Sequence, residues 1–178
     1  MIRLFAALPV PLEISTGLAD VRTGVPGARW RPDEALHITL RFFGEVQETA
    51  AADLDEALAA VSGESFDLSL SGAGAFGPGD HMHAIWAGVS ESPSLRQLAA
   101  RCEAAARRCG LAAERRVFRP HVTLAYLKHS PQDRVAEWVQ THSLLASPGW
   151  RAREIGLYSS WRSAQGSRYE LERTYPLL

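Results

Sequence analysis

The same short pattern of a histidine, an aliphatic residue, a threonine and a leucine occurs twice in this chain. It begins at His37 in "ALHITLRFFG" and at His121 in "FRPHVTLAYL". The β-branched and aromatic residues of both segments are typical of β-strands. Because residues i and i+2 of a strand point to the same face, Thr39 shares a face with the first histidine and Thr123 with the second. Each segment therefore presents an imidazole beside a hydroxyl.

Two such segments facing one another would place two imidazoles and two hydroxyls around one small space. These groups suit in-line displacement at phosphorus, because a neutral histidine can accept a proton from the attacking water while a protonated histidine donates one to the departing oxygen. The threonine hydroxyls can donate hydrogen bonds to the non-bridging oxygens and orient the phosphate. The symmetry of the arrangement does not distinguish the donor histidine from the acceptor.

The elements that would position these groups repeat in the two halves of the chain. His37 and His121 lie 84 residues apart in a chain of 178 residues, which is typical of an internal duplication. Helices are predicted over 11–24, 45–63, 93–108 and 131–142, and strands over 2–8, 35–44, 65–76, 81–89, 120–127, 150–160 and 167–177. We expect one compact domain, residues 1–178, built as two lobes.

Charge and composition limit the classes of partner. The net charge of −1 argues against a protein that coats duplex nucleic acid, which needs a broad basic face to neutralise phosphates. Lys128 is the only lysine, so the positive charge is almost all arginine, whose planar fork suits a small phosphate site. No GxxxxGK[ST] loop for ATP phosphates occurs, and "GAGAFG" lacks the following helix that a nucleotide loop needs.

The remaining sequence features indicate a cytoplasmic protein. The N-terminal apolar run contains Pro9, Pro11 and Glu13 and has no small-residue cleavage pattern, which indicates a strand rather than a signal peptide. No segment approaches the ~20 apolar residues of a membrane span. Cys102 and Cys109 on one predicted helix would lie about 10 Å apart along its axis, too far for a disulfide. We therefore expect free thiols and a monomer.

The motif segments resemble those of a known family. "LHITLRFFGEV" and "FRPHVTLAYL", with "RLFAAL", "HAIWAGV" and "LYSSWRSAQGSRYELERTYPL", are similar to the two-histidine (2H) phosphoesterase superfamily, specifically its 2'-5' RNA ligase-like (LigT-like) branch of RNA 2',3'-cyclic phosphodiesterases. The resemblance implies a bilobal, pseudo-two-fold duplicated α+β fold, in which antiparallel sheets line a central cleft and helices lie outside. It also implies metal-independent, cofactor-free hydrolysis of an RNA-terminal 2',3'-cyclic phosphate to a 2'-phosphomonoester. Some relatives also join tRNA halves reversibly through 2'-5' bonds.

Carried over onto the matching positions, the resemblance implies a role for each motif residue. His37 would be the proton donor to the leaving 3' oxygen, and His121 would be the proton acceptor from water. Thr39 and Thr123 would hold the phosphate. The implied partners are RNA ends that carry a 2',3'-cyclic phosphate, tRNA fragments among them.

Three further residues are expected to contact the substrate. Arg41 and Phe43 share strand parity with His37, so Arg41 could bind phosphate and Phe43 could offer an aromatic face to a base. Tyr126 follows the second motif, where members of the resembled branch often carry a basic residue. We expect Tyr126, like Arg41 and Phe43, to contact the substrate.

Other interpretations remain open beside this one. An H-x-H on a strand can supply two metal ligands, but no further ligand is near His81 and His83 in the sequence, and "GPGDHMH" is typical of a loop running into a strand; no metal site is expected. The same histidine pair would also serve a phosphodiesterase for small cyclic nucleotides, such as ADP-ribose cyclic phosphate. A non-catalytic RNA-end binding module is the second alternative, although the intact histidine and threonine of both motifs argue against it.

Overall fold

The protein is described by a computed structural model that covers residues 1–164 and 166–178. Its elements in chain order are β1 (Ile2–Pro9), α1 (Leu12–Gly17), β2 (Ala28–Trp30), β3 (His37–Val46), α2 (Glu48–Ala59), β4 (Phe66–Leu68), β5 (Leu70–Phe76), β6 (Ala84–Val89), α3 (Pro93–Arg108), β7 (His121–Leu127), α4 (Gln132–Thr141), β8 (Trp150–Ala152), β9 (Glu154–Ser163) and β10 (Gly166–Pro176). Two short 3-10 helices, Ala19–Val21 and Asp33–Ala35, flank β2.

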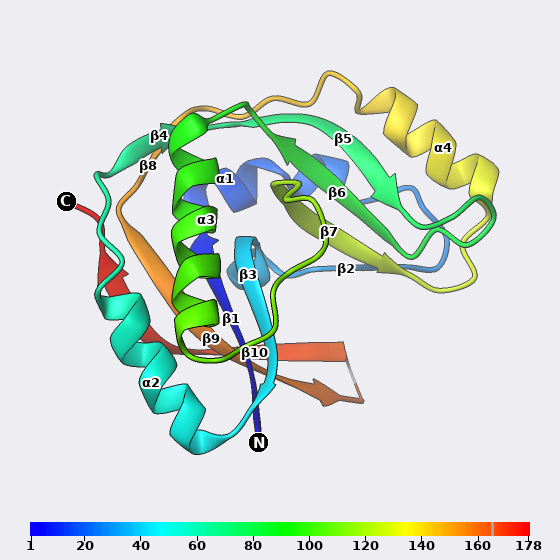
Figure 1. The fold of residues 1–178 in the computed structure, drawn as a ribbon. Coiled ribbons are helices and arrows are strands. Elements are labelled where there is room, and N and C mark those ends of the chain that lie inside the picture. The colour runs from blue at the N-terminus through cyan, green and yellow to red at the C-terminus, as the bar shows by residue number, and fades with distance from the viewer. Residues whose placement is uncertain (165) are drawn as a thin grey trace.

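Most strands form one antiparallel sheet. Its order is β10–β9–β1–β3–β7–β6–β5, and β2 also pairs with β7 (Figure 1). β4 and β8 form a separate two-stranded sheet. The two motif strands, β3 and β7, are neighbours in the middle of the main sheet. This confirms the predicted α+β fold with antiparallel strands, and it shows that one sheet runs through both lobes rather than a separate sheet in each.

Each lobe draws strands from both halves of the chain. β9 and β10, from the second half, extend the side of the sheet that contains β1 and β3. β5, from the first half, extends the side that contains β6 and β7. The lobes are therefore not the two sequence halves, because each half gives its last long strands to the lobe of the other motif.

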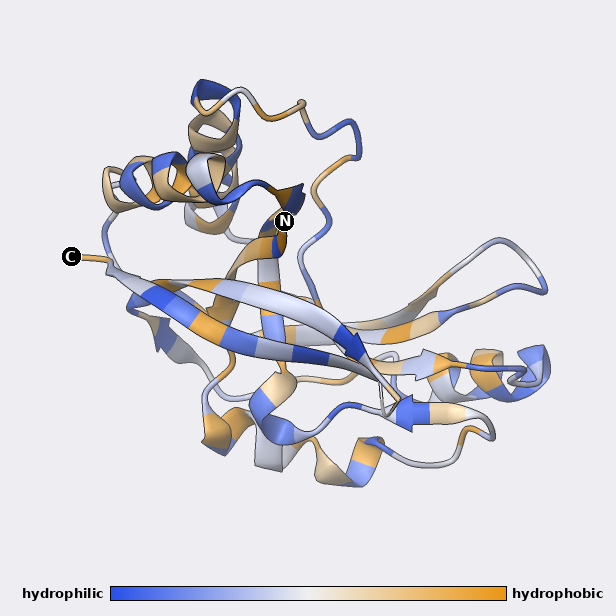
Figure 2. Cartoon of the chain, turned by 90° about the horizontal axis from the view of Figure 1, so that it is seen from below, coloured by the Kyte–Doolittle hydropathy of each residue, from blue (hydrophilic) through white to orange (hydrophobic). Residues whose placement is uncertain are grey.

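The helices cover the sheet from outside. Along α3, Leu95, Leu98, Cys102 and Ala105 are buried and recur at three- or four-residue spacing, the pattern of a helix with one apolar face on a core. The hydroxyl of Ser92 accepts a hydrogen bond from the Leu95 N–H at 3.2 Å and caps the helix. α3 packs against α2 and β3, and α4 packs against β5. Figure 2, which views the chain from below, shows helices on both sides of the sheet.

Some predicted elements have different limits in the structure. The first helix ends at Gly17 and gives way to a short 3-10 helix instead of reaching Gly24, because glycine and β-branched residues weaken helices. The strand expected over 65–76 divides into β4 and β5, which pair with different neighbours. Cys102 and Cys109 are free, as predicted. Among the described residues, no helix is long and apolar enough to cross a membrane.

Candidate active site

The two motif strands meet at the central residues of the motifs. Ile38 of β3 pairs with Val122 of β7 in antiparallel register, and both side chains are fully buried. Because the strands run in opposite directions and side chains alternate between faces, this register sets the histidine of each motif across from the threonine of the other, away from the buried pair. The pseudo-two-fold axis expected from the duplication therefore passes between Ile38 and Val122.

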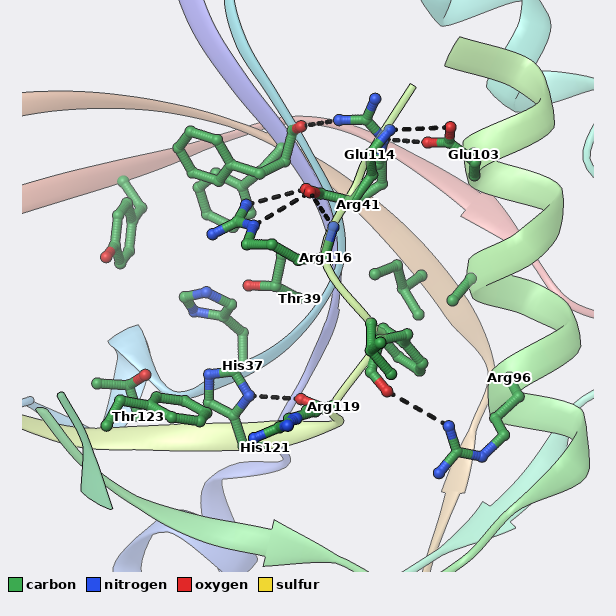
Figure 3. Close-up of a pocket in the computed structure, with 18 of the residues that line it drawn as sticks. His37, Thr39, Arg41, Arg96, Glu103, Glu114, Arg116, Arg119, His121 and Thr123 are labelled. Carbon is green, nitrogen blue, oxygen red and sulfur yellow. Dashed lines mark hydrogen bonds and ion pairs between the residues drawn. The ribbon is translucent and has the colours of Figure 1, made fainter. Parts of the chain in front are cut away.

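One cavity of about 990 Å³ is lined by all four motif residues, His37, Thr39, His121 and Thr123. Figure 3 shows the two imidazole rings close together, with both threonines beside them. β3 and β7 form the floor of the cavity, and α3 and residues 114–119 form one wall. The structure thus brings together the groups that the two sequence motifs predicted to act together.

Both imidazoles are oriented by a backbone carbonyl two residues earlier in the chain. The Nδ1 atom of His37 lies 2.8 Å from the carbonyl oxygen of Ala35, and the Nδ1 atom of His121 lies 2.6 Å from that of Arg119. A carbonyl can only accept, so Nδ1 carries the hydrogen in each ring. Nε2 is therefore the atom that remains for proton transfer in the cavity.

Aromatic rings enclose His37 and change its acidity. The Phe5 and Tyr169 ring centroids lie 4.9 and 5.3 Å from that of the imidazole. Burial lowers the pKa of His37 to about 4; the hydrogen bond to Ala35 opposes this shift, and the charges of Arg31 and His121 add to it. A buried imidazole loses hydration of its charged form, so its protonated state is a stronger acid than an ordinary imidazolium.

The second histidine has a similar apolar surrounding. The Phe76 ring meets His121 edge to face at 4.7 Å between centroids, and the indole of Trp86 lies 6.2 Å away. Gly74 on β5 makes room for that indole, because a Cβ there would lie only 2.3 Å from the ring. Burial lowers the pKa of His121 below its ordinary value. Burial thus favours the neutral form of both imidazoles in the free protein.

Phe43 does not lie on the face predicted for it. It is 8% exposed and belongs to the core, whereas its neighbour Phe42 is 36% exposed and lines the cavity. The reason is a register shift between β1 and β3 at Ala6/Ala7, where Thr39 and Arg41 pair with consecutive residues of β1. This irregularity of the bulge type lies between the motif and Phe43 and reverses the alternation of faces that the parity argument assumes.

Arg41 lies in the cavity wall, but its guanidinium is already bonded. It pairs with Glu103 of α3 and donates hydrogen bonds to the carbonyl oxygens of Phe42 and Ala112. The residue is only 8% exposed. The predicted phosphate contact is therefore replaced by a tie between β3, α3 and the segment that follows α3 (Figure 3).

Arg41→Ala is expected to lower the free energy of unfolding by about 3 kcal/mol, because it leaves the partly buried Glu103 carboxylate without its cation. Urea unfolding followed by circular dichroism measures this. Arg96→Ala is the matched control: Arg96 also pairs with a carboxylate, that of Glu91, but both side chains are largely exposed, so its unfolding midpoint should stay close to that of the wild type. Equal losses in the two variants would contradict a structural role for Arg41.

Tyr126, the third expected substrate contact, lines the cavity and is 39% exposed. The guanidinium carbon of Arg31 lies 5.6 Å from the centre of its ring, so a positive charge stands at this point of the cavity although the tyrosine is neutral. Sequence reasoning missed several other cavity residues, because they lie outside the two motifs and reach the cavity only through long-range strand pairing, a register shift or a loop: Phe5, Arg31, Phe42, Phe76, Arg116 and Tyr169.

The "HMH" segment lies in the loop before β6, so the strand predicted over 81–89 begins only at Ala84. His83 is exposed and lines the rim of the cavity, and its amide donates a hydrogen bond to the carbonyl oxygen of Phe76 at 2.9 Å. Within the described part of the chain, no group of three or more histidine, cysteine, aspartate or glutamate side chains is placed to hold a metal ion.

Comparison with known proteins identifies the family. The family model of the 2'-5' RNA ligase superfamily matches residues 10–163, which include both motifs. The chain belongs to this superfamily. The match confirms the resemblance that the two motifs carried, and it places the paired histidines within a family of phosphoesterases.

Several relatives carry the name RNA 2',3'-cyclic phosphodiesterase. An RNA 2',3'-cyclic phosphodiesterase of Aeropyrum pernix is 42% identical over 107 residues, and one of Geobacillus stearothermophilus is 33% identical over 180 residues. The match to the Aeropyrum protein covers 60% of this chain and 60% of that relative. The match to the Geobacillus protein covers 98% of this chain and 57% of that relative. Among solved structures, Escherichia coli LigT complexed with 3'-AMP superimposes with a TM-score of 0.79 at 25% identity, over 99% of this chain and 98% of LigT.

Proposed function

We propose that this protein hydrolyses the 2',3'-cyclic phosphate at an RNA 3' end to a 2'-phosphomonoester. The observation that supports this most strongly is the Ile38–Val122 strand pair, which sets two histidines with oriented Nε2 atoms beside one cavity. Two such imidazoles can transfer protons on opposite sides of one phosphorus. The names of the curated relatives agree with this reaction.

In the proposed reaction, His121 accepts a proton from water as the water oxygen bonds to phosphorus. The bond from phosphorus to the 3' oxygen breaks, and protonated His37 donates its Nε2 proton to that oxygen. A pKa of about 4 makes protonated His37 a stronger acid than an ordinary imidazolium, which favours proton transfer to the leaving oxygen but makes the protonated form scarce near pH 7. Thr39 and Thr123 donate hydrogen bonds to the non-bridging oxygens, whose negative charge grows in the transition state.

The cavity supports an RNA end more than a small cyclic nucleotide as substrate. Its volume of about 990 Å³ is at the upper end of the range for small-molecule sites. Phe42 adds an exposed ring at the cavity, stacked on Phe5 with centroids 5.9 Å apart. In this proposal Phe42 takes the base-stacking role that the sequence assigned to Phe43, since single-stranded RNA is commonly read by stacking on aromatic rings.

Ligation follows from the same chemistry with a different nucleophile. If the 5' hydroxyl of a second RNA replaces water at His121, the phosphorus passes to that hydroxyl, the 3' oxygen leaves as before, and a 2'-5' diester forms. The energy comes from the strained cyclic phosphate, so no nucleoside triphosphate is needed. Adding an RNA with a free 5' hydroxyl, a tRNA half for example, tests this: a longer 2'-5' linked product supports ligation, and hydrolysis alone contradicts it.

The test of the function is incubation with a short RNA that ends in a 2',3'-cyclic phosphate, in the presence of EDTA. The 2'- and 3'-phosphate products are separated by chromatography. Formation of the 2'-phosphate alone is expected, because the 3' oxygen is the leaving group. Activity only after a divalent metal is added, or only on small cyclic nucleotides, would contradict the proposal.

Thr39→Val and Thr123→Val are each expected to lower kcat by roughly 10- to 100-fold, which corresponds to the loss of one charge-assisted hydrogen bond of about 1.5–3 kcal/mol. Valine keeps the shape of threonine and removes only the hydroxyl. Steady-state kinetics on the cyclic phosphate RNA measures the effect. The serine variants, which keep a hydroxyl, should recover most of the rate; serine variants as slow as the valine variants would show that the hydroxyls do not act.

A further inference from the structure

Arg31 is held firmly at the edge of the cavity. It follows β2, and its amide donates a hydrogen bond to the carbonyl oxygen of Leu124, next to the second motif threonine, at 2.8 Å. Its own carbonyl oxygen accepts a hydrogen bond from the Arg22 guanidinium at 2.8 Å, and Arg22 also forms an ion pair with Asp33. The backbone of Arg31 is therefore tied to β7 on one side and to the segment before β3 on the other.

The guanidinium of Arg31 is positioned by two aromatic rings. Its central carbon lies 5.6 Å from the ring centre of Tyr126 and 5.1 Å from that of Tyr169, within the range of a cation–π interaction. One N–H donates to the carbonyl oxygen of Ser167 at 3.0 Å. Tyr169 also contacts His37, edge to face at 5.3 Å. One tyrosine ring thus touches both the guanidinium and a reacting histidine.

Arg31 differs from most other arginines of the cavity because it has no described carboxylate partner. Arg41, Arg96 and Arg116 are each paired with a carboxylate, from Glu103, Glu91 and Glu114 respectively. Among the described residues, no acidic partner of Arg31 occurs. Arg119 has no described acidic partner either, but its side chain is exposed. Arg31 is consequently a fixed cation with no described anion, close enough to His37 to oppose its protonation.

We propose that Arg31 binds the scissile phosphate through its guanidinium, and that Tyr126 acts by positioning Arg31 rather than by contacting the substrate. An arginine fork matches two phosphate oxygens, and the phosphate anion supplies a negative partner for Arg31, which has none among the described residues. Placed between Arg31 and His37, it relieves the repulsion between guanidinium and imidazolium. Binding of substrate then favours the protonated state that the acid needs.

This inference rests on the proposed function, and the kinetics of single-residue variants of this chain test it. Arg31→Gln should lower kcat/KM for cyclic phosphate RNA by about a hundredfold, the scale of losing one preorganised donor to a developing anion. Arg29→Gln is the matched control: Arg29 lies two residues earlier on β2, is exposed and does not line the cavity, so this variant should match the wild type. Arg31→Lys keeps the charge without the fork and should recover only part of the loss.

The pH profile separates this role from a structural one. Without the Arg31 charge the pKa of His37 rises, so the acid side of the kcat/KM profile should move to higher pH in Arg31→Gln. Unchanged activity in this variant, or a loss with an unshifted profile, would overturn the inference.

A double-variant comparison tests the part assigned to Tyr126. Tyr126→Ala should lower kcat/KM, and Tyr126→Phe, which keeps the ring, should recover most of that loss. In the Arg31→Gln background, Tyr126→Ala should have little further effect, since residues that act through one another are not additive. A full additional loss in that background would show that the tyrosine acts on the substrate independently of Arg31.

Phosphate binding distinguishes failure of this inference from failure of the proposed function. Titration of the protein with adenosine 2'-monophosphate, followed by calorimetry, needs no turnover. If the wild type binds this probe and Arg31→Gln binds it at least tenfold more weakly, the inference stands even when cyclic phosphate RNA is not hydrolysed. Equal binding by both proteins would overturn the inference even when RNA hydrolysis is confirmed.

Discussion

His37→Ala and His121→Ala are each expected to lower kcat on RNA 2',3'-cyclic phosphate by at least two to three orders of magnitude, the scale expected for removing a general acid or base. Each variant leaves one proton transfer without a partner while the rest of the cavity stays in place. Single-turnover measurements with enzyme in excess give the chemical step directly. KM should change less than kcat, because the imidazoles act on the reacting atoms more than on the bound ground state.

The third imidazole of the same cavity provides the control for these variants. His83 lies at the rim, and His83→Ala should have a rate close to that of the wild type. The His37→Ala/His121→Ala double variant should be little slower than either single variant, because groups that act as one unit are strongly non-additive. A rate near that of the wild type for either single variant, with its fold intact by circular dichroism, would remove that histidine from the mechanism.

The second large expected effect is the dependence of kcat/KM on pH. The reaction needs one histidine protonated and one neutral, and burial lowers the pKa of both in the free enzyme, that of His37 to about 4. The kcat/KM profile should therefore be a bell with its maximum between pH 4 and the ordinary histidine value of 6.5. Above that range it should fall about tenfold per pH unit, as the singly protonated enzyme becomes scarce.

The profile of kcat should lie at higher pH than that of kcat/KM. A bound phosphodiester anion stabilises imidazolium and so raises the pKa of both histidines in the complex. Initial rates from pH 4 to 9 give both profiles, and a solvent deuterium isotope effect checks that proton transfer limits the rate. A kcat/KM that stays constant from pH 6 to 8.5 would contradict an acid drawn from this histidine pair.

The motif faces could be predicted from sequence because they depend only on short-range geometry. Within His37–Thr39 the strand is regular, so period-two alternation places both side chains on one face. Two residues further along, the alternation no longer holds. The register shifts opposite Arg41 and Phe43 depend on the pairing of β3 with β1, and a single strand read alone carries no sign of them.

Other features of the site depend on contacts distant in sequence or on the backbone. The carbonyl oxygens that orient the imidazoles belong to Ala35 and Arg119, and every residue type carries such a group. Arg31 joins the site through a strand of only three residues, β2, which is too short for a periodic signal. Tyr169 reaches the site from β10. This strand lies beside the site because it pairs with β9, which in turn pairs with β1.

Because outer strands are exchanged between the lobes, neither half of the chain forms a complete lobe by itself. β5 completes the lobe of the second motif and β9 that of the first, so a single half carries its motif strand in one lobe and an outer strand in the other. Two copies of such a half could each be completed only by the other, as a domain-swapped pair with an isologous interface. The motif strands would meet on the symmetry axis, and the pair would share one reaction centre rather than hold two.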